Sequence, residues 1–315
     1  MDLVVCNSRS DSVSVLLGYE KDFFLSQMIY ETGYSPRAMI TTYLNDDDVL
    51  DLVVVNYRDS SIGVLLGAGN GMFNTSVNYT VGVYPISVVA ADFNNDTKQD
   101  LAVTNYDNKF ITVLLNNGKG SFPTMKSYAV GRKPQAITTA DFNNDRKMDL
   151  AVANYGDNTI SVLLGNGDGN FENSSKYTVG ANPTAIVSAD FNDDKIIDLV
   201  VVNYSDGSIS VLLGSQYGTF LPFMELKVGL YPTSATVDDF NNDGKSDPAV
   251  VNVGDNTVEV LLGKGDGKFQ TPNKYGTETV PVYVTSGDLN NDNRSDLIVI
   301  NEYSMSVSVF LNVCQ

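Results

Sequence analysis

Short apolar stretches separated by polar turns run along the whole chain. In residues 183–229, the stretch PTAIVSADF is followed by the polar loop NDDKII, then by DLVVVNY, the turn SDG, SISVLLG, a glycine-rich connection and TFLPFMELKVG. These stretches have the lengths and the β-branched content of strands, and no segment keeps the 3.6-residue period of a helix. The pattern therefore predicts four short β-strands, which we name A to D in chain order.

The pattern repeats every 49 residues from end to end. Aspartate and asparagine each recur in seven copies at this spacing, at Asp2, Asp51, Asp100, Asp149, Asp198, Asp247 and Asp296 and at Asn7, Asn56, Asn105, Asn154, Asn203, Asn252 and Asn301. Proline and phenylalanine recur in six copies, at Pro36, Pro85, Pro134, Pro183, Pro232 and Pro281 and at Phe24, Phe73, Phe122, Phe171, Phe220 and Phe269. Four antiparallel strands repeated about seven times predict a β-propeller, because a solenoid would need a shorter repeat.

The number of repeats decides the number of blades. Seven blades of 49 residues exceed the 315 residues of the chain by about one strand D, one strand A and the loop between them, whereas six would leave a spare hairpin. We therefore expect one all-β domain over residues 1–315, a seven-bladed β-propeller of four-stranded antiparallel blades. Blade 1 should lack the innermost strand A and blade 7 the outermost strand D. Because native propellers normally close such open edges, we expect the chain to be part of a longer protein.

The connection between strands A and B carries the most specific motif, D-x-N-x-D-x-x-x-D, in five copies. Oxygen-bearing side chains at alternating positions of a tight loop favour Ca²⁺, which accepts six to eight oxygen ligands at flexible geometry. We expect side-chain ligands from positions 1, 3, 5 and 9 and the backbone carbonyl of position 7. The predicted ligands of about five Ca²⁺ ions are Asp92, Asn94, Asp96, Lys98 and Asp100; Asp141, Asn143, Asp145, Lys147 and Asp149; Asp190, Asn192, Asp194, Ile196 and Asp198; Asp239, Asn241, Asp243, Lys245 and Asp247; and Asp288, Asn290, Asp292, Arg294 and Asp296.

Two other interpretations of the motif deserve comparison. An EF-hand loop would need Gly at position 6, Glu at position 12 and flanking helices, but position 12 of the first complete loop is Val103, inside a predicted strand. Asp and Asn also form Asx-turns without any metal, and this alternative stays open. Tyr43 replaces the first Asp in the loop of blade 2, so we expect at most a weak site there, from Asn45, Asp47 and Asp51.

Composition narrows the possible functions. The chain has 20 Lys and Arg against 38 Asp and Glu, a net charge of −18, which disfavours nucleic acid and anionic membranes as partners. It has no His, so the usual general base at neutral pH is missing, and no Trp, the best residue for stacking on sugars. The two cysteines, Cys6 and Cys314, lack any zinc spacing, and they either form a disulfide between the end blades or are two buried thiols.

The segment D-x-N-x-D-x-x-x-D-L-x-V, which opens strand B, resembles the FG-GAP/VCBS repeat family, which includes the integrin alpha N-terminal propeller. Weaker signatures of that family are Gly-x-Gly-x-Phe, as in Gly167, Gly169 and Phe171, and Gly-x-x-Pro, as in Gly180 and Pro183. The resemblance covers the whole chain. It implies that calcium lies on one side of the propeller and that partners bind the opposite face, formed by the D–A and B–C connections.

If partners bind that face, Tyr84, Arg132, Lys133 and Tyr231 are the best candidate contacts, because Tyr and Arg dominate interface hot spots. The repeated Tyr57, Tyr106, Tyr155 and Tyr204 either pack within the fold or form a ring of recognition side chains, and we favour packing. Asn7 and its equivalents should hydrogen-bond into the B–C turn.

We expect an extracellular or cell-surface module that binds calcium and recognises or adheres to a protein or glycan, with neither catalysis nor direct membrane insertion. Glycosylation sequons on outer strands, at Asn74, Asn78 and Asn173, agree with that location. The alternatives are a lectin and a calcium-assisted polysaccharide lyase or hydrolase. For an enzyme, Asp46, Asp48 and Glu302 are the only acids outside the repeat pattern that would be candidates.

Overall fold

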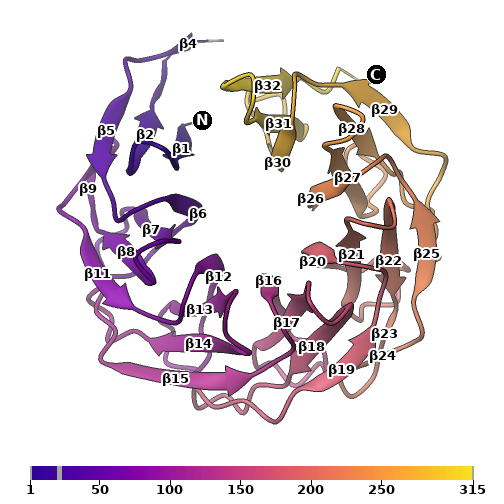
Figure 1. Ribbon diagram of the computed structural model, residues 1–315, viewed down its shortest axis with the longest axis horizontal. Helices are drawn as coiled ribbons and strands as arrows, with labels where there is room; N and C mark the ends of the chain where they lie inside the picture. The colour runs from indigo at the N-terminus through magenta and orange to yellow at the C-terminus, as the bar shows by residue number, and fades with distance from the viewer. Residues whose placement is uncertain (1, 20–22, 314–315) are drawn as a thin grey trace. The chain divides into compact units, whose positions relative to one another are not determined.

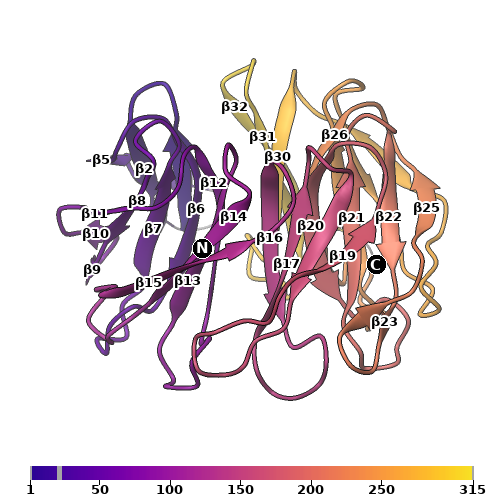
Figure 2. The same cartoon turned by 60° about the horizontal axis from the view of Figure 1, so that its bottom comes forward.

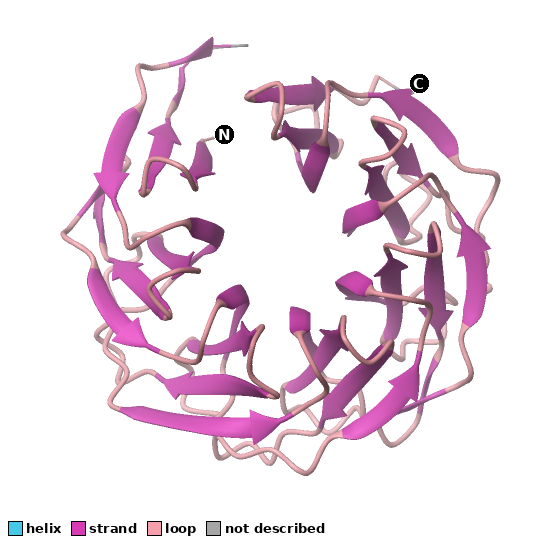
Figure 3. Ribbon diagram, in the orientation of Figure 1, coloured by secondary structure: helices cyan, strands magenta, loops and turns pink. Residues whose placement is uncertain are grey.

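The computed structural model describes residues 2–19 and 23–313. In these residues strands and turns are the only regular structure, and no helix is present (Figure 3). Accordingly, the described part of the chain contains no helix long and apolar enough to cross a membrane.

Each strand A begins at a repeated proline. These strands are β6 (Pro36–Thr42), β12 (Pro85–Ala91), β16 (Pro134–Ala140), β20 (Pro183–Ala189), β26 (Pro232–Asp238) and β30 (Pro281–Gly287). Proline has no N–H for the ladder and is tolerated at the first residue of an edge strand or at a bulge. Both conditions hold in β12, which pairs on one side only and whose register shifts between Pro85 and Val88.

Strands B and C form the middle of each blade. Strands B are β1 (Leu3–Asn7), β7 (Asp51–Asn56), β13 (Asp100–Asn105), β17 (Asp149–Asn154), β21 (Asp198–Asn203), β27 (Asp247–Asn252) and β31 (Asp296–Asn301). Strands C are β2 (Ser12–Leu16), β8 (Ser61–Leu65), β14 (Phe110–Leu115), β18 (Thr159–Leu163), β22 (Ser208–Leu212), β28 (Thr257–Val260) and β32 (Ser306–Phe310). Every residue of β7, β13, β17, β21 and β27 is buried, since both faces of a central strand are covered.

Strands D are short and largely exposed. They are β5 (Met28–Glu31), β11 (Val77–Thr80), β15 (Thr124–Ala129), β19 (Ser175–Thr178), β25 (Met224–Lys227) and β29 (Asn273–Gly276). The stretch predicted as one strand from Thr219 is split in the structure: Thr219–Phe220 (β24) pairs back with Gly214–Ser215 (β23), and strand D begins at Met224. Similar hairpins join strands C and D in two other blades, as β3 (Gly18–Tyr19) with β4 (Phe23–Phe24) and β9 (Gly67–Gly69) with β10 (Met72–Phe73).

The strands assemble into seven antiparallel blades in the order A-B-C-D, which confirms the predicted fold. Five blades have four strands, and the described parts of the first and last blades have three, β1-β2-β5 and β30-β31-β32. Within a blade, the A–B and C–D connections lie at one end of the strands and the B–C and D–A connections at the other (Figure 2). The predicted calcium ligands, in the A–B connections, therefore lie at the opposite end of each blade from the predicted recognition residues, in the D–A connections.

The described residues form two compact units, which we describe separately. Unit 1 comprises Met1–Thr139, Lys147–Val152 and Ser161–Ser175, and unit 2 comprises Ala140–Arg146, Ala153–Ile160 and Lys176–Gln315. In each unit strand A of one blade contacts strand A of the next, β6 with β12 in unit 1 and β20 with β26 in unit 2 (Figure 1).

Apolar cores fill the space between neighbouring blades of a unit. In unit 1, one core joins Val53, Val55, Ile62 and Val64 of one blade to Leu101, Val103, Leu114 and Phe122 of the next. In unit 2, another joins Val200, Val202, Ile209 and Val211 to Val250, Leu261 and Phe269. Stability therefore depends on contacts between repeats, as in other repeat proteins.

Of the two cysteines, only Cys6 is among the described residues. Cys6 is half-buried beside an apolar cluster that includes Val13, Leu52 and Val54. Cys314 lies outside the described residues.

Candidate functional site

The A–B loop at residues 92–100 is held by its own acidic and amide side chains. Asp92 Oδ1 accepts the backbone N–H groups of Asn94 (3.3 Å) and Asp96 (3.1 Å), and its Oδ2 accepts that of Thr97 (2.7 Å). Asp96 Oδ1 accepts the N–H of Lys98 at 3.0 Å. These bonds make the loop a chain of Asx-turns, which lets Asn95 and Thr97 take left-handed φ values of 57° and 69°. The side chains at positions 1 and 5 therefore turn inward over the loop.

The other loops of the motif repeat this geometry. Oδ2 of the first aspartate accepts the N–H of position 6 in each, from Arg146 to Asp141 (2.6 Å), Lys195 to Asp190 (2.7 Å), Gly244 to Asp239 (2.7 Å) and Asn293 to Asp288 (2.8 Å). The Asn at position 3 accepts the N–H of position 5, at Asn143 (3.0 Å), Asn192 (3.0 Å), Asn241 (3.0 Å) and Asn290 (2.9 Å). One local sequence thus produces one local structure.

The aspartate at position 9 is buried at the base of the loop. Asp100 is fully buried; its Oδ2 accepts the N–H of Phe93 (3.0 Å) and its Oδ1 that of Asn116 (2.7 Å). Burial raises the pKa of Asp100 to about 6, the two N–H bonds oppose this shift, and the charges of Asp96 and Asp92 reinforce it. The pKa of Asp198 is likewise raised to about 6 by burial, opposed by N–H bonds from Gly214 and Phe191 and reinforced by two neighbouring aspartates.

This donor set fits Ca²⁺ chemically. It supplies carboxylate and amide oxygens, and a carboxylate oxygen that accepts one N–H bond keeps a further lone pair for a cation. In residues 2–19 and 23–313 no three acidic side chains converge into a preassembled cage. The carboxylates point instead at backbone N–H groups.

Lysine side chains lie beside two of these loops. Lys245 Nζ is 3.4 Å from Asp243 Oδ2, and Lys98 Nζ is 4.0 Å from Asp96 Oδ2. Lys98 and Lys245 occupy position 7, so their ammonium groups offset part of the charge of position 5.

The loop of blade 2 departs from the others where its sequence departs. Tyr43 has no carboxylate to accept the N–H groups of positions 5 and 6. Two other bonds of the motif are kept: the Val49 N–H donates to Asp47 Oδ1 (3.0 Å), and the Asp47 N–H donates to Asn45 Oδ1 (3.2 Å). Asp51 still accepts the N–H of Leu44 (2.7 Å) and of Gly67 (2.8 Å), as position 9 does elsewhere.

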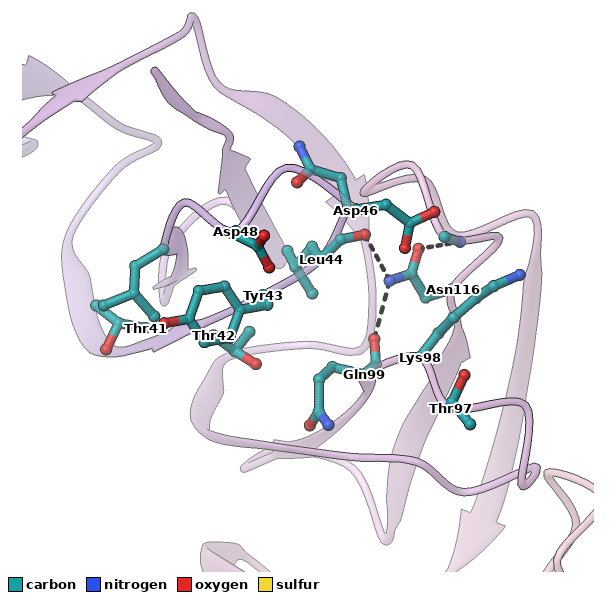
Figure 4. Close-up of a pocket in the computed structure, with 13 residues that line it drawn as sticks. Thr41, Thr42, Tyr43, Leu44, Asp46, Asp48, Thr97, Lys98, Gln99 and Asn116 are labelled. Carbon is teal, nitrogen blue, oxygen red and sulfur yellow. Dashed lines mark hydrogen bonds between the residues drawn. The ribbon is translucent and has the colours of Figure 1, made fainter. Parts of the chain in front are cut away.

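A pocket of about 670 Å³ opens beside this irregular loop (Figure 4). Its lining includes Tyr43, Asp46, Asp48 and Lys98. Asn116 stands at its edge, where its Nδ2 donates to the carbonyls of Leu44 (2.9 Å) and Gln99 (3.0 Å). The pocket shows that two of the acids outside the repeat pattern, Asp46 and Asp48, lie together.

The A–B loops at Leu44, Phe93 and Phe191 are each joined by a backbone hydrogen bond to the C–D connection of the following blade. The N–H of Gly169 donates to the carbonyl of Phe93 (2.9 Å), and Gly267 donates to Phe191 in the same way (3.0 Å). The ring of Phe93 meets that of Phe171 edge-on at 5.4 Å. The Gly-x-Gly-x-Phe signature therefore connects blades at the loops that carry the acidic motif.

A repeated tyrosine of strand D, which the sequence analysis missed, completes this junction. The hydroxyls of Tyr30 and Tyr128 donate to the carbonyls of Gly71 (3.2 Å) and Gly169 (3.1 Å) in the next blade. The signal was present, because tyrosines recur at this 49-residue spacing at Tyr30, Tyr79, Tyr128, Tyr177 and Tyr275.

On the opposite face, the predicted recognition residues pair with the repeated tyrosines. Tyr84 stacks on Tyr57 with centroids 4.7 Å apart, and Tyr231 stacks on Tyr204 at 5.1 Å. The Lys133 ammonium lies 5.3 Å from the centroid of the Tyr106 ring. Arg132, in the same connection as Lys133, is exposed. The tyrosines pack against neighbours, and Tyr57, Tyr106 and Tyr204 stay partly exposed.

Three of the four predicted contacts share an unusual backbone conformation. Tyr84, Lys133 and Tyr231 have φ values of 53°, 52° and 53°, and each directly precedes the proline of strand A. A left-handed φ is uncommon for residues other than glycine. No feature of the sequence predicted this backbone conformation.

The repeated asparagine of strand B is buried in all blades but the first, whereas the asparagines of the predicted glycosylation sequons are exposed. Asn105 is fully buried; its Oδ1 accepts the N–H of Gly82 (2.8 Å) and its Nδ2 donates to Thr112 Oγ1 (3.1 Å). By contrast, Asn74, Asn78 and Asn173 are exposed.

Comparison with protein families and solved structures agrees with this architecture. The FG-GAP-like repeat matches residues 43–103, 92–152, 141–201, 190–250 and 239–299, which together span most of the chain. The chain belongs to the FG-GAP-like repeat family. Each FG-GAP match begins at position 1 of an A–B loop and ends in strand B of the next blade. The family resemblance inferred from the motif is confirmed. No curated protein matches the sequence.

Several solved structures resemble this FG-GAP chain. A functionally unknown protein from Desulfotomaculum acetoxidans DSM 771 has 14% identity and a TM-score of 0.74, over 99% of this chain and 92% of that one. Virginiamycin B lyase from Staphylococcus aureus has 14% identity and a TM-score of 0.67, over 98% and 91%. BBS1N, crystallised in complex with ARL6DN, has 13% identity and a TM-score of 0.68, over 99% and 86%. At such identities the likeness shows the fold alone.

Proposed function

We propose that this FG-GAP chain is an extracellular, calcium-stabilised propeller that recognises a protein or glycan and has no catalytic activity. The observation that carries the proposal is the charge arrangement of the A–B loops. A buried aspartate at position 9 lies beside aspartates at positions 1 and 5, as with Asp198, Asp190 and Asp194. Burying a carboxylate near two others is unfavourable unless a cation offsets the charge.

Calcium is the cation that suits these loops. The ligands offered are oxygens only, and the flexible coordination of Ca²⁺ tolerates side chains that also hold backbone N–H groups, whereas Mg²⁺ demands near-ideal octahedral geometry. Each loop joins strand A to strand B, and the loops at Phe93 and Phe191 are also bonded to the next blade. An ion bound there would therefore stabilise the fold by linkage.

The recognition role is supported by the opposite face. Tyr231 is 49% exposed although it stacks on Tyr204, and Arg132 and Lys133 are exposed next to a partly exposed Tyr106. Aromatic and arginine side chains that are both exposed and held in place are typical of interface hot spots. BBS1N, a similar propeller, forms a complex with another protein.

Extracellular location follows from the same chemistry. Calcium sites of modest affinity fill at the millimolar concentrations found outside cells. The exposed Asn74, Asn78 and Asn173 would then be available for glycosylation.

Two alternative functions are an enzyme that acts on carbohydrates and a lectin. A carbohydrate-active lyase or hydrolase would use the pocket that holds Asp46 and Asp48, and a lyase is among the structural neighbours. A lectin would use one tyrosine-lined site per blade. Glycan arrays and turnover assays on polysaccharides, each with and without Ca²⁺, separate these from a protein-recognition module.

Equilibrium dialysis of chelator-treated protein against Ca²⁺ tests the central proposal. We expect about five ions per chain, one for each complete motif. The double variant Asp190→Ala/Asp194→Ala should bind one ion fewer than the wild type. Asp266→Ala, which removes an exposed acid outside the motif, should bind the wild-type number. A chain that binds no calcium at millimolar concentration contradicts the proposal.

A further inference from the structure

The D–A and B–C connections of unit 1 carry an unusual share of positive charge. We call this surface the connection face of unit 1; it comprises residues 8–11, 32–37, 57–60, 81–86, 106–109 and 130–135. It carries six basic residues, Arg9, Arg37, Arg58, Lys109, Arg132 and Lys133, against three acidic ones, Asp11, Asp59 and Asp107. The face is therefore positively charged in a chain whose net charge is −18.

The equivalent connections of unit 2 have the opposite sign. Residues 155–158, 179–184, 204–207, 228–233, 253–256, 277–282 and 302–305 contain no Lys or Arg and five acids, Asp157, Asp206, Asp255, Glu278 and Glu302. Arg9 and Arg58 occupy one position of the 49-residue repeat, where the later repeats have Asp107, Gly156, Ser205, Gly254 and Tyr303. Because the scaffold is the same in all repeats, packing does not require arginine at this position.

Arg9 and Arg58 line the same groove. The groove has a volume of about 520 Å³ and is lined by Ser8, Arg9, Asp11, Tyr34, Ser35 and Arg58. Among these described residues Asp11 is the one acid, and its Oδ1 accepts the N–H of Ser35 at 2.8 Å. The neighbouring Asp59 is likewise engaged, since its Oδ2 accepts the N–H of Tyr34 at 2.6 Å. The lining thus contains two guanidinium groups, three hydroxyls and one carboxylate that is bonded to a backbone N–H.

We propose that this groove binds an acidic peptide segment of a partner protein through the side-chain carboxylates of Asp or Glu. The inference rests on the recognition role proposed above and gives it a site and a ligand chemistry. Guanidinium groups bind carboxylates through paired N–H donors. The hydroxyls of Ser8, Ser35 and Tyr34 supply further hydrogen bonds.

Aromatic side chains beside the groove favour a peptide over a highly charged polysaccharide. Tyr34 is 62% exposed, and the Arg37 guanidinium lies 5.5 Å from the centroid of the Tyr57 ring, which stacks on Tyr84. Exposed or partly exposed tyrosines next to arginines offer apolar contact together with charge, and both residue types are enriched at the hot spots of protein interfaces. Polysaccharides that bind by charge alone do not need the rings.

Fluorescence anisotropy with a labelled oligo-glutamate peptide tests this inference on the calcium-saturated chain. The wild type should bind the peptide at low ionic strength, and binding should weaken as salt is added. The variant Arg9→Gln/Arg58→Gln should bind about tenfold more weakly or worse, since it loses the hydrogen bonds between charged groups. The control Lys264→Gln/Lys268→Gln, which changes the net charge equally at exposed residues of unit 2, should bind nearly as the wild type does.

Three results overturn the inference. The first is that the wild type does not bind the peptide. The second is that the arginine variant binds the peptide as tightly as the wild type does. The third is that the wild type binds heparin through these arginines but does not bind the peptide. Calcium dialysis on the same samples separates the two proposals. A chain that binds calcium normally but does not bind the peptide rejects only the proposal for the groove. A chain that binds the peptide but no calcium rejects only the proposed role of calcium.

Discussion

At the scale of single residues, the buried aspartates of position 9 set how stability should depend on pH. The folded pKa of Asp100 and of Asp198 is raised from 3.8 to about 6, chiefly by burial. An acid whose pKa is higher in the folded than in the unfolded state binds protons more tightly when folded. Its favourable contribution is therefore complete below about pH 4 and is lost as the pH rises through about 6.

We expect the metal-free chain to lose stability between about pH 4 and about pH 7. Urea unfolding at a series of pH values in metal-free buffer measures this slope, and Asp198→Asn, which cannot ionise, should make it shallower. Saturating Ca²⁺ should flatten the slope by favouring the ionised carboxylates. If stability rose with pH in metal-free buffer, the raised pKa values of Asp100 and Asp198 would not control it.

Tyr43 offers a test in the opposite direction, by gain of a site. Tyr43→Asp would complete the motif in blade 2, where Asn45, Asp47 and Asp51 already stand at positions 3, 5 and 9. The new carboxylate should accept the N–H groups of positions 5 and 6, as Asp92 does. We expect Tyr43→Asp to bind one calcium ion more than the wild type in equilibrium dialysis. Tyr43→Phe is the control, and an unchanged count in Tyr43→Asp would show that position 1 does not limit binding in this loop.

At the scale of strands and connections, the repeated glycine before strand A packs on the repeated asparagine of strand B. A Cβ atom added at Gly82 would lie 2.5 Å from Cγ of the buried Asn105, and one at Gly180 would lie 2.5 Å from Cγ of Asn203. Gly33 and Gly229 meet Asn56 and Asn252 in the same way. The close approach explains why glycine recurs here although the backbone does not require a left-handed φ.

Gly82→Ala should therefore destabilise the chain by about 1–3 kcal/mol, the usual cost of overpacking. Gly276→Ala is the matched control, because an added Cβ there meets nothing within 4 Å. Its effect should stay within about 0.5 kcal/mol. Chemical denaturation measures the free energy of unfolding of both variants. Equal stabilities would mean that Asn105 moves aside at little cost.

How far the sequence predicts these elements depends on whether a feature repeats. The strands, the proline at each strand A and the acidic loops follow from the 49-residue period, since one local pattern fixes each of them. The recurrence of Tyr128 and its equivalents marks them as part of the scaffold, but the sequence does not identify the acceptor, because Gly169 lies 41 residues away in the next blade. The left-handed backbone conformation of Tyr84 and the groove lined by Arg9 and Arg58 depend on how the connections pack against one another. Local sequence patterns do not predict that packing.

At the scale of the whole molecule, repeated scaffold positions and irregular surface positions have separate roles. Asn105 and its equivalents are identical in seven repeats and are buried in all but the first, where Asn7 is half-buried, whereas Arg9 and Arg58 are confined to two repeats and exposed. Residues that pack the blades must suit every repeat, but a specific partner needs only one surface. Function specific to this chain therefore belongs to the positions where the repeat is broken.

The stability of the whole chain should depend on calcium. Each ion that binds only the folded state adds about 2.7 kcal/mol when its free concentration is a hundred times its dissociation constant. About five such sites would together add about 13 kcal/mol, which is comparable to the whole stability of a typical domain. Chelation with EDTA should therefore lower the melting temperature by more than about ten degrees. Differential scanning calorimetry with EDTA, then with excess Ca²⁺, measures the loss and its recovery, and Mg²⁺ in place of Ca²⁺ should restore far less. An unchanged melt in EDTA would mean that the Asx-turns alone hold the A–B loops, and the acidic motif would then have a structural role without a metal.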